Sequence, residues 1–124
     1  MRVWCVILAI SAILATVSIA ETFVAKKFCT QIENSVMDIS EKIKTDTVST
    51  DDIDKIDEVW RKNKTAVFSF ANHNLFKEYE DCISEMYYYS KFELKDKLHY
   101  TAYYLLEVNN RMRETVKFNV ANIF

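Results

Sequence analysis

The apolar residues of this chain follow two patterns: an uninterrupted run near the N-terminus and one-sided helical stripes after it. No residue from Val3 to Ala20 is charged. These eighteen residues would extend about 27 Å as a helix, close to the ~30 Å hydrocarbon core of a bilayer. The run therefore predicts a transmembrane segment within residues 1–20.

Two readings of residues 1–20 compete. In the first, Ser18 and Ala20 are the small residues before the cut of a cleaved signal peptide. In the second, the segment is an uncleaved signal-anchor. Apolar residues continue past Ala20 without a helix breaker, at Phe23, Phe28 and Ile32, so the membrane helix can run into the next helix. We favour the signal-anchor, followed by a helical domain at residues 21–124.

Four later segments carry apolar residues three or four positions apart, which is the period of an amphipathic helix. In the first segment the spacings between successive apolar residues are 4, 4, 3 and 4, at Phe28, Ile32, Val36, Ile39 and Ile43. The predicted helices are residues 21–44, 51–72, 75–89 and 94–113. The apolar residues of 115–124 predict a tail that docks on these helices.

Polar residues mark the connections between the predicted helices. Thr50 is the expected N-cap of the second helix, with acidic residues in the first turn that favour the positive end of the helix dipole. The run Asn72-His73-Asn74 predicts a turn, because Asn tolerates the left-handed conformation of a C-cap when Gly is missing.

Short connections make neighbouring helices run antiparallel. The sequence thus predicts an all-α fold: an N-terminal transmembrane helix that continues into an antiparallel helical bundle of about four helices. The alternative arrangement is two stacked αα-hairpins of the repeat-protein kind.

Composition strengthens the helical prediction. The chain contains no Gly and no Pro, whereas average usage is roughly 7% and 5%. Sheets need many tight corners, and phosphate-cradling loops need glycines, so the double absence argues against sandwiches, barrels and nucleotide-binding folds. The net charge is −2 with both signs interleaved. No concentrated basic face indicates nucleic-acid binding.

Residues able to carry chemistry are few. His73 and His99 are the only histidines, and Asp96 with His99 makes one D-x-x-H pair. Di-iron bundles need two Glu-x-x-His pairs and two further Glu residues, so we expect no metal site, no cofactor and no catalytic constellation. An enzyme that uses His73 or His99 as an acid or base is the least favoured hypothesis.

The three cysteines are Cys5, within the apolar run, and Cys29 and Cys82, within the predicted helices. There is no CxxC motif, which removes zinc-ribbon and thioredoxin-like chemistry. We expect Cys29 and Cys82 to be buried thiols. The alternative is a disulfide between them, if the domain lies outside the cytoplasm.

Tyrosines cluster in the second half of the chain. Residues 87–89 are consecutive tyrosines, and each helical residue turns by about 100°, so the three cannot all face one core. The sequence predicts an aromatic interaction surface on the bundle. Its candidate residues are Trp60, Tyr87, Tyr88, Tyr100 and Tyr104. The alternative is amphipathic packing at the edge of the bundle.

The chain resembles an uncharacterised family of short membrane-anchored helical proteins, mostly from clostridia and related Firmicutes. The resemblance is carried by the apolar run Val3–Ala20, the Trp60 region, the His73 turn and the ending Phe118…Asn122-Ile123-Phe124. Residues 74–77 depart from it, because members tend to be more acidic there. The resemblance implies a bacterial envelope location and supplies no known activity or cofactor.

These observations lead to one expected function and one alternative. We expect a non-enzymatic, single-pass protein of the bacterial cell membrane that presents its bundle to a partner protein or to itself. Lys26 and Lys27 favour a cytoplasmic domain, but Arg2 and the signal-like form of the segment favour the opposite orientation, so we expect the domain to be extracytoplasmic. The alternative is a small-molecule or peptide-binding domain, with a pocket lined by Trp60, Phe70 and the tyrosines.

Overall fold

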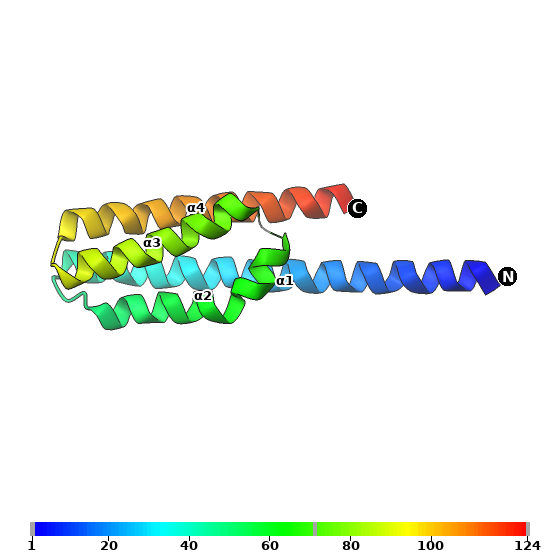
Figure 1. Cartoon of the computed structure of the whole chain (residues 1–124), viewed down its shortest axis with the longest axis horizontal. Helices are drawn as coiled ribbons and strands as arrows, with labels where there is room; N and C mark the ends of the chain where they lie inside the picture. Colours follow the sequence, from blue (N-terminus) through cyan, green and yellow to red (C-terminus); the bar gives the residue numbers. More distant parts are fainter. Residues whose placement is uncertain (1, 71, 124) are drawn as a thin grey trace.

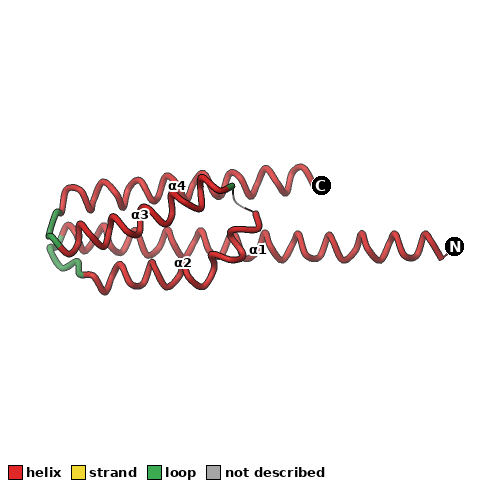
Figure 2. The backbone as a smooth tube through the Cα atoms, viewed as in Figure 1, coloured by secondary structure: helices red, strands yellow, loops and turns green. Residues whose placement is uncertain are grey.

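The computed structural model describes residues 2–70 and 72–123, without the side chains of residues 18, 68–70 and 118–123. Over these ranges the fold is all-helical and contains no strand. The helices are α1 (Arg2–Lys44), α2 (Thr50–Phe70), α3 (His73–Lys91) and α4 (Lys95–Ile123). Figure 2 shows how short the connecting loops are. The prediction of an all-α fold with about four helices is confirmed.

The helices lie side by side, and consecutive helices point in opposite directions (Figure 1). The second half of α1 packs on α2 and α4, and α3 also packs on α2 and α4. Each helix therefore contacts two neighbours, and the buried side chains of all four form one hydrophobic cluster.

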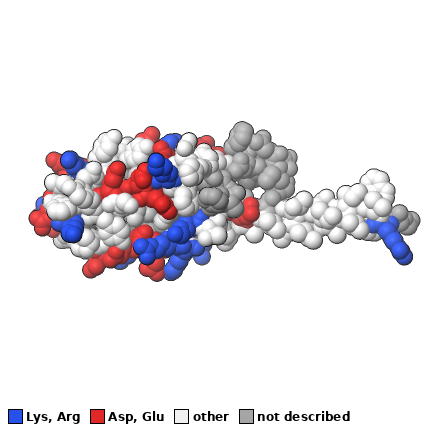
Figure 3. Space-filling view, viewed as in Figure 1, with Lys and Arg blue, Asp and Glu red and all other residues white. Residues whose placement is uncertain are grey.

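The helix α1 is 43 residues long, and its two halves lie in different surroundings. Its first half extends beyond the other helices as a stalk (Figure 1), and large apolar side chains such as Trp4 and Leu8 are exposed all along it. By length and composition this stalk is a candidate membrane span, and none of its most apolar window is buried. Figure 3 shows the stalk almost free of charged side chains, with basic atoms near its tip.

The second half of α1 is part of the core. Phe28, Ile32, Val36 and Ile39 are all buried, as their spacing predicts. Burying a side chain of this size contributes roughly 1.5–3 kcal/mol relative to leaving it exposed. The same helix that forms the exposed stalk therefore also contributes to the core, packed on α2 and α4.

Two helix ends need a left-handed residue, and no glycine exists to supply it. Asp46 (φ 59°) follows α1, and Glu93 (φ 55°) follows α3. Each closes a Schellman motif. After α1 the N–H of Thr47 donates to the Lys42 carbonyl (2.9 Å), and after α3 the N–H of Leu94 donates to the Tyr89 carbonyl (2.9 Å).

The predicted caps are wrong in detail. The Asp52 carboxylate accepts the Ser49 N–H (2.9 Å), which is one half of a capping box, so Ser49 and not Thr50 caps α2. Asn72 is extended (φ −74°, ψ 160°) and its side chain accepts the Leu75 N–H (2.8 Å). It therefore begins α3 instead of ending α2, and α3 starts earlier than expected.

The tail predicted at residues 115–124 is not a separate element. The helix α4 continues to Ile123, and Val116 is still buried in the common core. Docking of the apolar side chains beyond that point lies outside the described residues.

Candidate functional site

Trp60 is a core residue and not part of a surface. Its side chain is 3% exposed and stacks on Tyr79, with ring centroids 5.0 Å apart. The ring centroids of Phe28 and Phe76 lie 5.9 and 4.9 Å from that of Trp60. The reason is the inward stripe of α2, in which Ile53, Ile56 and Trp60 follow one another at helical spacing. This packing corrects the predicted surface at Trp60. The alternative of a ligand pocket is not removed, because Trp60 and Tyr87 line a cavity of about 330 Å³ between α2 and α3. The side chain of Phe70 lies outside the described residues.

Tyr87 and Tyr104 are half-buried and bound to carboxylates of neighbouring helices. The Tyr87 hydroxyl donates to Asp54 of α2, and the Tyr104 hydroxyl donates to Glu78 of α3 (3.1 Å). Burial, together with the bond to Asp54, raises the pKa of Tyr87, and the bond to Glu78 raises the pKa of Tyr104. Both hydroxyls therefore stay protonated and link helices within the bundle.

Tyr88 and Tyr100 are the members of the predicted surface that face solvent, with exposed fractions of 57% and 72%. Tyr103 and Phe92 are similarly exposed. The Phe92 ring lies 4.8 Å from the Tyr88 ring. We call Tyr88, Phe92, Tyr100 and Tyr103 the outer aromatic residues. Sequence reasoning missed Phe92 because it lies in the α3–α4 loop, where helical periodicity gives no signal.

Asn109 is the most buried polar residue among the described side chains, and both ends of its amide make hydrogen bonds. Its Oδ1 accepts the Tyr79 hydroxyl (2.7 Å), and its Nδ2 donates to the Cys29 carbonyl (2.8 Å). Desolvation raises the pKa of Tyr79 far above its usual value. This arrangement joins α1, α3 and α4 by hydrogen bonds inside the core.

The histidines give no support to acid–base catalysis. His73 and His99 are both exposed, and no hydrogen bond or ion pair to either is found within the described part of the chain. Over the same residues, no group of three or more His, Cys, Asp or Glu side chains could hold a metal ion.

The cysteines are unpaired thiols. Cys29 and Cys82 are buried and free, so the alternative of a disulfide between them is not realised. Desolvation raises the pKa of Cys29 to about 11, in spite of the nearby Arg113 guanidinium. Desolvation also raises the pKa of Cys82 to about 12. A thiol with so high a pKa has almost no thiolate at neutral pH and is a poor nucleophile.

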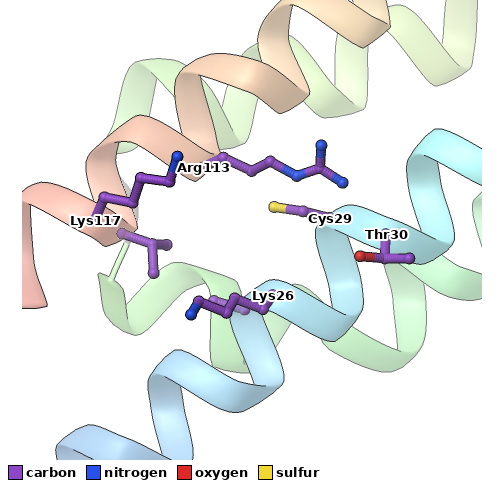
Figure 4. Close-up of a pocket in the computed structure, with 7 residues that line it drawn as sticks. Lys26, Cys29, Thr30, Arg113 and Lys117 are labelled. Carbon is purple, nitrogen blue, oxygen red and sulfur yellow. The ribbon is translucent and has the colours of Figure 1, made fainter.

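A cleft between α1 and α4 was not predicted. Its lining includes three cationic side chains, Lys26, Arg113 and Lys117. The other lining residues are Ala25, Cys29, Thr30 and Val116. We call it the basic cleft; Figure 4 shows Cys29 Sγ pointing into it from α1. Arg113 pairs with Glu33 of α1 at 2.5 Å, which joins the two helices at this level.

The chain matches no protein-family model, no curated protein and no solved structure. The resemblance to the clostridial family therefore stays a prediction, carried by the sequence motifs alone.

Proposed function

We propose that this chain is a non-enzymatic, single-pass membrane protein of the bacterial envelope whose antiparallel helical bundle binds a partner protein or a second copy. One observation carries the proposal. The exposed apolar stalk and the buried stripe beginning at Ala25 belong to one continuous helix, α1. A membrane span joined to a core without a flexible linker would hold the bundle at a fixed distance from the bilayer.

The length of the apolar run favours an anchor over a cleaved signal. Signal peptides have apolar regions of about 7–15 residues, whereas Val3–Ala20 is charge-free over eighteen. In water, exposed side chains such as Trp4, Leu8 and Ile13 would form an apolar surface without a partner. A bilayer would cover all sides of the stalk at once.

The outer aromatic residues are the proposed contact surface. Aromatic side chains are enriched at protein interfaces because they bury a large area with few rotatable bonds. Tyr88, Phe92, Tyr100 and Tyr103 lie on α3, α4 and their loop, away from the stalk. A surface at that place would be presented to a partner beyond the membrane.

The anchor is tested by expressing the full chain with a C-terminal tag in a bacterial host. We expect it in the alkaline-carbonate-resistant membrane fraction, with an intact mass that includes residues 1–20. The double variant Ile10→Arg/Ile13→Arg should leave that fraction, because each central Arg costs roughly 2.5–3.5 kcal/mol of insertion free energy. Ile10→Leu/Ile13→Leu is the matched control. A mature chain that begins at Glu21 would refute the anchor.

Orientation needs its own reporter. Alkaline phosphatase fused after Phe124 is active only outside the cytoplasm, and green fluorescent protein fused there fluoresces only inside it. We expect an active phosphatase fusion. The reverse result would place the bundle in the cytoplasm.

The contact surface is tested by photo-crosslinking in native membranes. A photoreactive phenylalanine analogue is placed at Tyr88 or Tyr100, and at Lys55 of α2 as an exposed control. We expect a discrete crosslinked band from the two tyrosine positions alone. Equal crosslinking from all three positions, or none from any, would count against this surface.

A further inference from the structure

The basic cleft combines positive charge with an apolar floor. Lys26, Arg113 and Lys117 border it from two helices, and none of its described lining residues is a carboxylate. Ala25, Cys29 and Val116 supply buried apolar walls. In Figure 4 the Arg113 side chain extends from α4 over Cys29 of α1, and Lys26 and Lys117 stand on opposite sides of the opening. Glu33 pairs with the Arg113 guanidinium, whereas no ion pair to Lys26 or Lys117 is found among the described side chains.

The position of the cleft relates it to the stalk. Lys26 lies six residues after Ala20, or about 9 Å along the helix axis. The headgroup layer on each side of a bilayer is about 5–8 Å thick. With residues 3–20 in the hydrocarbon, the cleft would begin at the outer edge of the headgroup layer, and the long side chain of Lys26 can reach back into that layer.

The helix α4 extends the same end of the molecule. It has 29 residues against 19 in α3, and its C-terminal turns run beside α1 towards the stalk (Figure 1). Arg113 and Lys117 belong to this stretch. The two helices that form the cleft are therefore the two that reach closest to the bilayer.

We propose that the basic cleft binds the phosphate of an anionic phospholipid headgroup, with the glycerol side of the lipid against the apolar floor. Arg and Lys are the usual phosphate ligands of proteins, and an anionic leaflet attracts basic side chains close to its surface. Free phosphate shares this chemistry, but only a lipid also uses the apolar walls and is supplied by the membrane. The inference rests on the proposed membrane anchor.

The test uses the purified full chain in mixed micelles of phosphatidylglycerol and phosphatidylcholine with identical acyl chains. Native mass spectrometry counts the lipids that the protein retains. We expect phosphatidylglycerol to be retained preferentially, and Lys26→Gln/Lys117→Gln to lower that preference about tenfold or more. Lys26→Arg/Lys117→Arg should preserve it. Lys91→Gln/Lys97→Gln removes the same charge at the opposite end and should change nothing.

Each other outcome is decisive. A wild-type chain without lipid preference, or equal losses in both glutamine variants, overturns the site while leaving the anchor intact. If sodium phosphate in large excess stabilises the chain and displaces no lipid, the cleft is a free-phosphate site and the lipid is refuted. If the anchor test fails first, the lipid site falls with it.

Discussion

The hydroxyl of Tyr79 donates a hydrogen bond to Oδ1 of Asn109 across the α3–α4 interface, at 2.7 Å and without access to solvent. The amide of Asn109 continues the link to the Cys29 carbonyl on α1, at 2.8 Å. In an apolar core such a link fixes how far each helix slides along its neighbours, because any shift leaves a buried polar group unsatisfied.

This link predicts an uneven mutational response. Tyr79→Phe removes the hydroxyl and leaves Asn109 Oδ1 buried without a donor, so we expect a loss of about 1–3 kcal/mol in unfolding free energy. Urea unfolding of the full chain in detergent, followed by circular dichroism, measures it. The double variant Tyr79→Phe/Asn109→Leu should cost less than the sum of the single changes. Strict additivity would mean that the two side chains are not coupled.

Of the two side chains in this link, Asn109 could be recognised from the sequence and Tyr79 could not. Asn109 lies on the apolar stripe of α4, between Leu105 and Met112, so a polar residue on the core face could have been noticed. Its partner Tyr79 depends on the relative register of α3 and α4. Register is set by the packing of whole helix surfaces, which no single-helix periodicity contains.

The same distinction explains which predictions were correct. Helix periods and the core stripe of α1 are local properties, and the structure confirms them. The burial of Trp60 was implied by its spacing from Ile56, but its aromatic character drew it into the predicted surface instead. The basic cleft joins residues 26 and 117, and such a distant pair has no local signal.

Glu93, at the end of α3, has a left-handed backbone conformation that lowers the stability of the folded chain slightly. A non-glycine residue in the left-handed region costs about 1–2 kcal/mol relative to glycine. Replacing it with glycine removes this cost, but part of the gain is offset because glycine also makes the unfolded chain more flexible. We therefore expect Glu93→Gly to raise the unfolding free energy by about 0.5–1 kcal/mol, measured by urea unfolding. Glu93→Ala keeps the Cβ and should bring no such gain.

Asp46 offers a matched comparison at the other Schellman motif. Its carboxylate pairs with Lys95 at the start of α4, so Asp46→Gly removes an exposed ion pair as well as the strain. The gain should be smaller than for Glu93→Gly. An equal or larger gain would show that this ion pair adds nothing to stability.

Acid should weaken the start of α2. Burial alone would raise the pKa of Asp52, but hydrogen bonds from Lys42 and the Ser49 N–H outweigh it and hold that pKa below its usual value. A depressed folded-state pKa gives stability that is present above the unfolded pKa of about 3.9 and is lost as the pH falls through the folded value.

Asp52→Asn tests this pH dependence, because the amide can still accept the Ser49 N–H but carries no charge. We expect the wild-type chain to be more stable than the variant at neutral pH, with the difference shrinking below about pH 4. Unfolding free energies measured from pH 7 down to pH 3 give the answer. A constant difference across that range would exclude a role for the carboxylate charge.

Thiol labelling should report folding and not function. At pH 8 a thiol with a pKa of about 11 is ionised in only about one molecule in a thousand, and both Cys29 and Cys82 are also shielded by packing. In the variant Cys5→Ser, we expect no maleimide labelling of the native chain and two labels after denaturation, counted by mass. Rapid native labelling would require an opening that exposes the core.

Substitutions at Trp60 and Tyr100 distinguish the effect of a core residue on stability from that of a residue in the proposed contact surface. Trp60→Leu leaves a cavity between Phe28 and Tyr79, and we expect a loss of roughly 2–4 kcal/mol in unfolding free energy. Tyr100→Ala changes an exposed position and should alter stability by about 0.5 kcal/mol or less. Urea midpoints of the two variants measure the contrast.

Partner binding should show the opposite order. With a crosslinker held at position 88, Tyr100→Ala should weaken the crosslinked band, because it removes another exposed aromatic side chain of the proposed surface. The core variant Trp60→Phe keeps an aromatic ring in the cluster. As long as this variant is folded, its crosslinked band should match that of the chain without the substitution. If the intensity of the crosslinked band instead falls with the unfolding free energy of each variant, the tyrosines act only through packing. The contact surface would then have to lie elsewhere on the helices.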